Sequence, residues 1–187
     1  SGRSAAMFEE NYGPPSVVAL NQAGVDYLRS ANGGYLTPRG LMLVAGRDQA
    51  DLFTKDVVEL NVRSISPQQA IDKVPILNPD VLAHAAISVD AFDIDTDRLM
   101  QDFTRVIRGN GGAVLTRQAV TDIRKSDHWV VQAGDVFEAR NLVNAAGAWV
   151  DEVAAMAGLP PIGIVPKRRS MARIPAPGGH DVSNWPM

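Results

Sequence analysis

Small residues at a predicted strand–helix junction are the feature of this sequence that most strongly suggests a binding site. Residues 142–146 form a short apolar run, Gly147 follows, and an apolar pattern of helical spacing begins two residues later. Ala145, Ala146 and Gly147 leave the backbone uncovered, so a large ligand can approach it closely. Because nucleotides bind beyond the carboxyl ends of strands in open α/β sheets, we expect a dinucleotide cofactor against residues 144–149, the Ala-Ala-Gly corner. Tight packing of a helix on a strand explains the same small residues equally well.

The composition excludes several classes of function. The chain has 187 residues, of which 45% are hydrophobic and 21% charged, as in globular proteins of one or two domains. A net charge of −3 gives no reason to expect nucleic acid or a membrane surface as a partner. The absence of cysteine excludes disulfides, thiolate metal ligands and cysteine nucleophiles, and it fits a reducing compartment, so we expect a cytoplasmic protein without a membrane span. His84, His128 and His180 are too widely spread to predict a metal site.

Periodic patterns predict alternating helices and strands in the first half of the chain. Ser4 is expected to cap a short helix over 5–8, and Pro15 is expected to open a longer helix. The apolar face expected for the longer helix comprises Val17, Leu20, Gly24 and Leu28. Strands are predicted over 35–37, 41–45 and 83–89, and helices over 52–60, after the capping box Ser66–Gln69, and after Asp95.

The helix after Asp95 has the clearest amphipathic pattern. Its apolar stripe consists of Leu99, Met100, Phe103, Val106 and Ile107, which we interpret as core rather than as ligand contacts. A glycine cluster at 109–112 follows it. Because this cluster follows a helix, we interpret it as a helix end and not as a phosphate-binding loop.

The pattern in the second half of the sequence predicts a sheet with an inserted hairpin. Strands are expected over 113–120, 121–125, 128–132, 136–139 and 142–146, then a helix over 149–157 and strands over 162–165 and 170–174. A parallel sheet that carries an antiparallel flap would give this order. The predicted class is therefore α/β.

Several segments resemble one family of flavoproteins. In order along the chain these are Gly2-Arg3-Ser4-Ala5-Ala6, Asp95-x-Asp97-x-Leu99 leading into Gly111-Gly112-Ala113, Val120-x-x-Ile123, Trp129-x-Val131 and Val143-Asn144-Ala145-Ala146-Gly147-Ala148-Trp149. Their order over nearly the whole chain is similar to that of the glycine/D-amino-acid oxidase superfamily of FAD-dependent oxidoreductases, which includes sarcosine oxidases and D-amino-acid dehydrogenases. The resemblance implies an incomplete Rossmann-like FAD-binding layer with an interleaved mixed or antiparallel substrate-domain sheet.

The resemblance also implies which residues contact FAD. They are Gly2, Arg3, Ser4, Val120, Ala145, Ala146, Gly147 and Trp149. It assigns 1–32 and 95–157 to a partial FAD-binding domain, and 33–94 and 158–187 to a partial substrate-binding domain. Lys167, Arg168 and Arg169 either face substrate or form a solvated basic edge.

Two parts of the family's flavin site have no counterpart in this sequence. The Gly-x-Gly-x-x-Gly turn with its ribose-binding acid, and the segment that completes the site from the carboxyl side, are missing. We therefore expect an internal fragment that binds FAD weakly or not at all alone, and that is inactive alone. Missing segments or a partner chain would complete its flavin site.

The chemistry that the resemblance implies is oxidation of a C–N bond in an amine or amino acid, such as glycine, a D-amino acid or an N-methyl amino acid. No residue can be assigned a catalytic role from the sequence. Glu9 and Glu10 lie near the position where sarcosine oxidases bind the substrate carboxylate with a basic residue, so they either favour a cationic amine or are solvated on a helix surface. The alternatives to an oxidoreductase are a non-catalytic binding module and a subunit that completes its flavin site with a partner.

Overall fold

The computed structural model describes residues 6–168, 170, 172 and 174–187. These residues form two compact units. The first lies within 1–106 and 172–187, and the second lies within 107–171. This division follows packing, and the functional division expected from the sequence remains a separate proposal.

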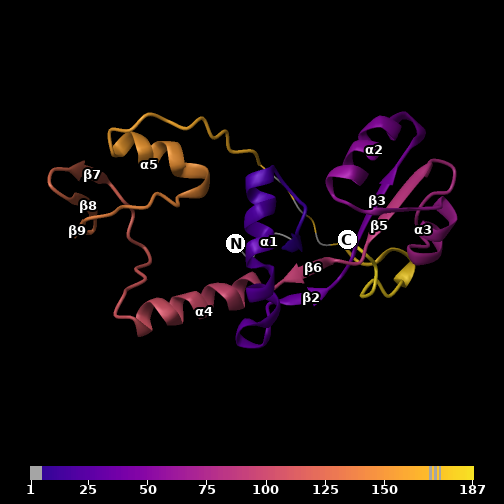
Figure 1. Ribbon diagram of the computed structural model, residues 1–187, viewed down its shortest axis with the longest axis horizontal. Helices are drawn as coiled ribbons and strands as arrows, with labels where there is room; N and C mark the ends of the chain where they lie inside the picture. The colour runs from indigo at the N-terminus through magenta and orange to yellow at the C-terminus, as the bar shows by residue number, and fades with distance from the viewer. Residues whose placement is uncertain (1–5, 169, 171, 173) are drawn as a thin grey trace. The chain divides into compact units, whose positions relative to one another are not determined.

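The first unit contains two three-stranded sheets in which every strand pair is antiparallel. One sheet has the order β1 (Met7–Glu9), β6 (Ala91–Ile94), β2 (Leu36–Pro38), and the other has the order β3 (Leu41–Ala45), β5 (His84–Ser88), β4 (Arg63–Ile65) (Figure 1). Ala85, Ala86 and Ala91 are at most 2% exposed and form the centre of these sheets. Strands β2, β3 and β5 were predicted from the sequence, and each lies within two residues of its expected range.

A β-bulge joins the two sheets. From the pair Pro38↔Phe92 to the pair Leu41↔Ser88, the segment that joins β2 to β3 advances by three residues. The opposite segment, which joins β5 to β6, advances by four. The amides of Arg39 and Gly40 both donate to the carbonyl of Ala91, at 3.1 and 2.9 Å. Such a bulge bends the strand and redirects its side chains.

The first predicted helix is wrong. Residues 7–9 form strand β1 because they pair with β6, with Phe8 opposite Phe92. Long-range pairing has overridden a weak local helix preference. The expected cap Ser4 lies outside the described residues.

Helix α1 (Pro15–Ser30) begins at the predicted proline, but its packed face is displaced by about one position. Val25 is buried, whereas Leu20 is 71% exposed. Asn21 lies on the packed side and donates through Nδ2 to the carbonyls of Glu9, Glu10 and Tyr12, at 3.3, 3.4 and 3.3 Å. A polar residue therefore attaches this helix to the segment after β1.

Helices α2 (Ala50–Glu59) and α3 (Pro67–Lys73) pack against β3 and β5 (Figure 1). The predicted capping box is confirmed at α3. The Gln69 amide donates to Ser66 Oγ at 3.2 Å, and the Ser66 amide donates to Gln69 Oε1 at 2.9 Å. Short 3-10 turns occur at Ala31–Gly33, Arg47–Gln49, Gly147–Trp149 and Pro177–Gly179.

Helix α4 (Thr96–Gly109) has the expected bounds, but its stripe is not core in the described chain. Met100 is 62% exposed and Val106 is 56% exposed, while the buried residue of the helix is Asp102. None of the helices in the described part of the chain is both long and apolar enough to cross a bilayer.

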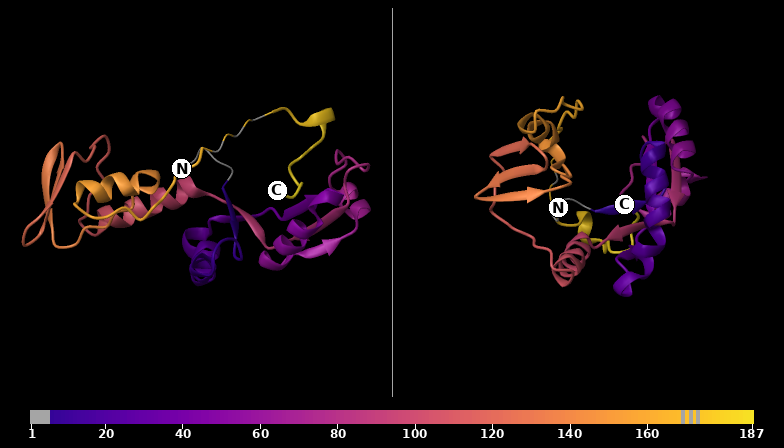
Figure 2. Two further views of the ribbon diagram at one scale, coloured as in Figure 1. Left: turned by 90° about the horizontal axis from the view of Figure 1, so that it is seen from above. Right: turned by 60° about the vertical axis from the view of Figure 1, so that its left-hand side comes forward.

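The second unit contains a three-stranded antiparallel sheet and one helix. The sheet has the order β7 (Asp122–Lys125), β8 (Trp129–Ala133), β9 (Asp135–Ala139), and α5 (Val150–Met156) packs on β7 (Figure 2). The β8–β9 hairpin turns at Gly134, where φ is +75°. Local turn chemistry predicted this hairpin correctly.

Three predicted strands are not formed. Residues 113–120, 142–146 and 162–165 are irregular, and the strand expected over 170–174 includes positions outside the described residues. A strand needs a neighbour for its amides and carbonyls, and the first two segments have no ladder partner within the described residues. Val143, at 83% exposed, and Leu115, at 54%, illustrate this lack of cover. The α/β class with antiparallel sheets is confirmed. The parallel sheet expected in the second half is wrong, because every strand pair among the described residues is antiparallel.

Candidate functional site

Asn144 fixes the shape of the Ala-Ala-Gly corner. Its Nδ2 donates to the Val150 carbonyl at 2.8 Å, and its Oδ1 accepts from the Ala146 amide at 3.2 Å. Gly147 has φ of +58°, a conformation in which side chains are rarely found. The corner is therefore held by the chain's own hydrogen bonds rather than by a sheet.

The backbone of the corner is accessible. Ala145 and Gly147 are exposed, Ala146 is half-buried, and Trp149 is 63% exposed. A Cβ built on Gly147 would meet nothing within 4 Å. The small residues thus leave an open surface at the corner in the described chain.

Asp151 organises the segment that follows α5, which the sequence did not predict. Its carboxylate accepts hydrogen bonds from the amides of Ile162, Gly163 and Ile164, at 2.9, 3.1 and 3.0 Å. An acidic residue in the first turn of a helix was the available signal. These bonds explain why 162–165 turns back toward the start of α5 and does not form a strand.

The remaining predicted cofactor residues are distributed as follows. Val120 is half-buried and directly precedes Thr121, whose amide donates to the Gln132 carbonyl at 2.9 Å. It therefore belongs to the same unit as the corner. Gly2, Arg3 and Ser4 lie outside the described residues. Lys167 and Arg168 are exposed, and Arg169 is also outside the described residues.

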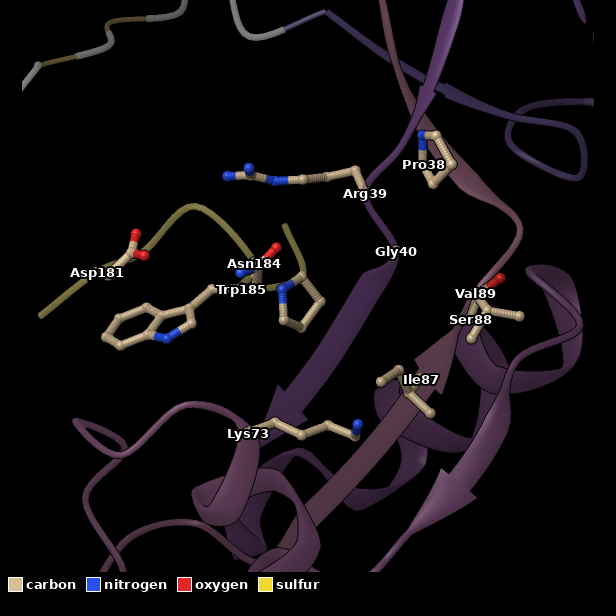
Figure 3. A pocket seen from close by; sticks show the side chains of 11 residues that line it. Pro38, Arg39, Gly40, Lys73, Ile87, Ser88, Val89, Asp181, Asn184 and Trp185 are labelled. Atoms are coloured by element: carbon tan, nitrogen blue, oxygen red, sulfur yellow. The ribbon is translucent and has the colours of Figure 1, made fainter.

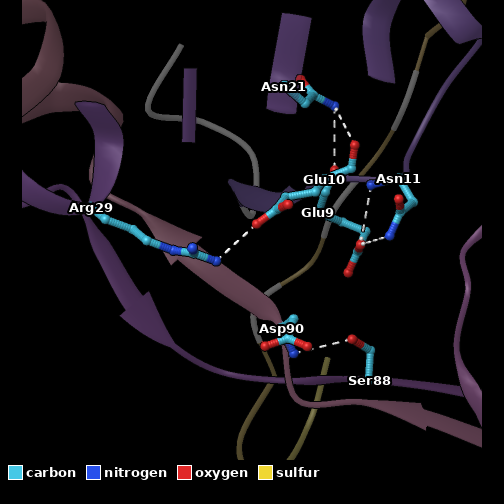
Figure 4. Close-up of polar contacts among 7 residues, drawn as sticks. All are labelled: Glu9, Glu10, Asn11, Asn21, Arg29, Ser88 and Asp90. Atoms are coloured by element: carbon cyan, nitrogen blue, oxygen red, sulfur yellow. Dashed lines mark hydrogen bonds and ion pairs between the residues drawn. The ribbon is translucent and has the colours of Figure 1, made fainter. Parts of the chain in front are cut away.

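Glu9 and Glu10 follow one another but have different environments (Figure 4). Glu10 Oε1 forms an ion pair with Arg29 Nη2 of α1 at 2.8 Å. Its charge is therefore already compensated. The expectation that both carboxylates lie on a helix surface is wrong, because Glu9 ends strand β1.

Glu9 is 5% exposed. Its Oε1 accepts from the amide and the Nδ2 of Asn11, at 3.3 and 3.4 Å, while Oε2 is buried without a hydrogen-bond partner among the described residues. Burial raises the pKa of Glu9, and the charges of Glu10 and Asp90 add to this effect, whereas the bonds from Asn11 oppose it. A buried carboxylate oxygen without a donor costs free energy and could accept a hydrogen bond from a ligand cation.

No group of three or more metal-ligating side chains occurs among the described residues.

Comparison with known proteins assigns the chain to a family. The sequence model of the family described as "FAD dependent oxidoreductase" matches residues 1–187. The chain belongs to this family. Solved structures to which the chain is similar have the same fold.

Three solved structures are similar over most of this chain. Glycine oxidase from Geobacillus kaustophilus has 23% identity and a TM-score of 0.66, covering 83% of this chain and 47% of its own. L-proline dehydrogenase from P. horikoshii has 18% identity and a TM-score of 0.66, covering 80% and 43%. Dithionite-reduced L-alpha-glycerophosphate oxidase from Mycoplasma pneumoniae, with FAD bound, has 16% identity and a TM-score of 0.67, covering 83% and 46%. At these identities the likeness shows the fold alone.

One curated relative is similar over a shorter region. Aerobic glycerol-3-phosphate dehydrogenase of Escherichia coli (strain K12) is 36% identical over 67 residues, which is 32% of this chain and 13% of the relative. The chain spans less than half the length of each of the solved structures and a smaller part of this relative.

The corner fits only part of an FAD molecule. Its open backbone and small side chains suit a flat, uncharged group such as adenosine. Between Arg140 and Lys167 the sequence has no basic residue, and Asp151 and Glu152 are acidic. A diphosphate therefore finds no cationic side chain on this segment.

Proposed function

We propose that this FAD-dependent oxidoreductase acts on a C–N bond of an amine or amino acid, such as glycine, a D-amino acid or an N-methyl amino acid. FAD supplies the hydride acceptor for the C–H bond next to the nitrogen. The chain's own residues bind the cofactor and orient the substrate.

The observation that carries the amine assignment is the buried Glu9. Oε2 of Glu9, which has no hydrogen-bond partner among the described residues, accepts a hydrogen bond from the substrate's ammonium group, and this removes the cost of leaving that oxygen unsatisfied. Glu10 has no such role because Arg29 already neutralises it. Glycine oxidase and L-proline dehydrogenase, two of the similar structures, are named for amino-acid substrates, which supports the proposal.

In this proposal the Ala-Ala-Gly corner holds the adenosine half of FAD. The backbone at Ala145, Ala146 and Gly147 makes the close approach, Trp149 borders it, and Val120 lies on the adenine side. Gly2, Arg3 and Ser4 remain part of this proposal as cofactor contacts on the family resemblance alone, because they lie outside the described residues. The flavin-binding parts are 1–32 and 95–157, and Glu9 in the first of these ranges also contacts the substrate. The substrate-binding parts are 33–94 and 158–187.

We further propose that residues 1–187 bind FAD weakly when alone. The corner lacks cations for the diphosphate, and the segments 113–120 and 142–146, in which most residues are exposed, lack partner strands within the described residues. Polypeptide outside these 187 residues, in the same chain or in a partner, covers these segments and completes the cradle. Spectrophotometric titration of the 187-residue chain tests this, and a submicromolar affinity for FAD would refute it.

A second candidate is oxidation of a phosphorylated polyol. The relatives named for glycerol phosphate favour it, one of them at 36% identity over 67 residues. A buried carboxylate such as Glu9 would repel a phosphate, and for this reason we prefer the amine. A non-catalytic binding module is a third candidate, and it predicts no flavin reduction by any substrate.

The test is anaerobic flavin reduction in the flavin-loaded protein. Glycine, N-methylglycine, D-amino acids and L-proline are compared with sn-glycerol 3-phosphate by the loss of oxidised-flavin absorption. Reduction by an amine and not by the phosphate ester is expected. Reduction by sn-glycerol 3-phosphate alone would overturn the amine assignment.

A further inference from the structure

A pocket at the β-bulge of the first unit is built from four separate segments. Pro38, Arg39 and Gly40 form one wall and Lys73 at the end of α3 forms a second (Figure 3). The third wall consists of Asp181, Asn184, Trp185 and Pro186, and the fourth of Ile87, Ser88 and Val89. Its volume is about 540 Å³. This is within the range of small-molecule sites.

The third wall is fixed to the sheet by backbone hydrogen bonds. The Met187 amide donates to the Gly40 carbonyl at 3.0 Å, and the Met42 amide donates to the Met187 carbonyl at 2.8 Å. Arg39 Nη1 also donates to the Ser183 carbonyl at 3.1 Å. The pocket is therefore a consequence of the fold and does not depend on a loose terminal segment.

Gly40 is required for this arrangement. Its φ is +80°, and an added Cβ would lie 3.1 Å from the Ser88 carbonyl oxygen and 3.6 Å from Pro186 Cβ. The bulge at Gly40 directs the neighbouring Arg39 side chain toward the pocket. Figure 3 shows Arg39 and Lys73 extending from different walls, with the Trp185 ring between them in that view.

The charges of the pocket favour an anion. Arg39 is 28% exposed at its side chain and is oriented by Ser183 and by Asp93, whose Oδ2 lies 4.0 Å from Arg39 Nε. That separation is too long for a hydrogen bond, so Asp93 compensates the guanidinium only weakly. Lys73 has no ion-pair partner within the described ranges of the chain. Asp181 is the acidic residue of the lining, and its Oδ1 is occupied by the Ser183 amide at 3.0 Å.

The rest of the lining selects the body of the ligand. Trp185, Pro186, Ile87 and Val89 give the pocket a largely apolar wall. Two cations and one carboxylate suit a ligand with a single negative charge better than a phosphate dianion. A guanidinium is also geometrically matched to a carboxylate.

We propose that this pocket binds a small organic monocarboxylate with a flat apolar body. The carboxylate contacts Arg39, Lys73 adds the attraction of a second positive charge from another wall, and the apolar body lies against Trp185. This site shares no residue with the Ala-Ala-Gly corner and does not include Glu9, and the proposal does not depend on the flavin.

Titration of the full chain with phenylacetate tests the proposal, with the indole N–H of Trp185 as the NMR reporter and those of Trp129 and Trp149 as internal references. Millimolar binding that shifts Trp185 alone is expected. Phenylacetamide, the neutral analogue, should bind at least about fivefold more weakly, because it lacks the charge-assisted hydrogen bonds. Equal affinity for phenylacetate and phenylacetamide would overturn the proposal, and so would tighter binding of inorganic phosphate.

Lys73→Met and Arg39→Lys are the diagnostic variants. Each should weaken the binding of phenylacetate at least about fivefold. Lys73→Met removes a positive charge, and Arg39→Lys removes the paired N–H donors of the guanidinium group. Lys55→Met is the matched control, since Lys55 pairs with Glu59 at 3.6 Å on α2, outside the pocket lining. An unchanged affinity in Lys73→Met, with a native circular dichroism spectrum, contradicts the assignment.

Discussion

The Tyr35 hydroxyl donates a hydrogen bond to Asp102 Oδ2 at 2.8 Å, joining the start of β2 to the middle of α4. Tyr35 is 2% exposed and Asp102 is 5% exposed, so both polar groups are buried. Asn32 Nδ2 donates to the same hydroxyl at 2.7 Å, and Arg105 forms an ion pair with the carboxylate. The bond from Tyr35, followed by the contacts of Arg105, lowers the pKa of Asp102. This network holds α4 although its apolar stripe is exposed.

Tyr35→Phe should lower the melting temperature. The change removes a donor from a buried carboxylate and leaves Asn32 Nδ2 without its acceptor. Tyr12→Phe is the control, because Tyr12 is 62% exposed. Because the folded pKa of Asp102 is lowered, its contribution to stability is present above the unfolded value near 3.8 and is lost as the pH falls. The difference in melting temperature between the wild type and Tyr35→Phe should therefore shrink in acid. A difference that grows below pH 4 would contradict this explanation.

Glu9→Gln should stabilise the fold at neutral pH and weaken amine binding. The pKa of Glu9 is raised by burial, so the folded state favours the neutral form, and its stability falls as the pH rises from about 4.5 through the folded pKa. Gln removes this dependence. Melting curves should show nearly equal melting temperatures for the wild type and Glu9→Gln at pH 4. As the pH rises toward 8, the melting temperature of the variant should increasingly exceed that of the wild type.

Kinetic measurements distinguish the role of Glu9 in amine binding from that of Glu10. In the flavin-loaded protein, Glu9→Gln should raise KM for an amine substrate about tenfold, which corresponds to loss of one charge-assisted hydrogen bond. Glu10→Gln, which breaks only the pair with Arg29, should leave KM near the wild-type value. Equal effects of the two variants would show that Glu9 has no special contact with the amine.

Asp151→Ala should release the segment after α5. Three amides, those of Ile162, Gly163 and Ile164, lose their shared acceptor. We expect a cost of about 1 kcal/mol and faster hydrogen exchange at these amides, with Glu152→Ala as the neighbouring control. Unchanged protection of the Ile162 amide would mean that the segment is held in another way.

Gly147→Ala should weaken FAD binding beyond its effect on stability. Its positive φ makes alanine unfavourable by about 1 kcal/mol, and the added methyl group projects into open space at the corner. Gly158→Ala is a matched control, because Gly158 has φ of +69° and an equally open Cβ position after α5. The two variants should lose similar stability, but FAD affinity in the complete flavoprotein should fall only for Gly147→Ala.

Local signals in the sequence predicted the elements that depend on local chemistry. Pro15, the Ser66–Gln69 capping box and the turn at Gly134 each specify the backbone within a few residues, and the structure confirms all three. Strand β1 was mistaken for a helix because its partner, β6, is distant in the sequence.

The missed features of the site have the same origin. The burial of Glu9, the three bonds to Asp151 and the position of Arg39 at a bulge all depend on contacts between separated segments. The segments 113–120 and 142–146 were interpreted as strands from their composition alone. Composition does not provide the neighbouring strand that a ladder requires.

The most direct test of the cofactor assignment is a crystal structure of the complete flavoprotein with FAD bound. We predict that the backbone of Ala145, Ala146 and Gly147 lies in van der Waals contact with the adenosine half of the cofactor. A structure in which this corner lies away from FAD would contradict the assignment.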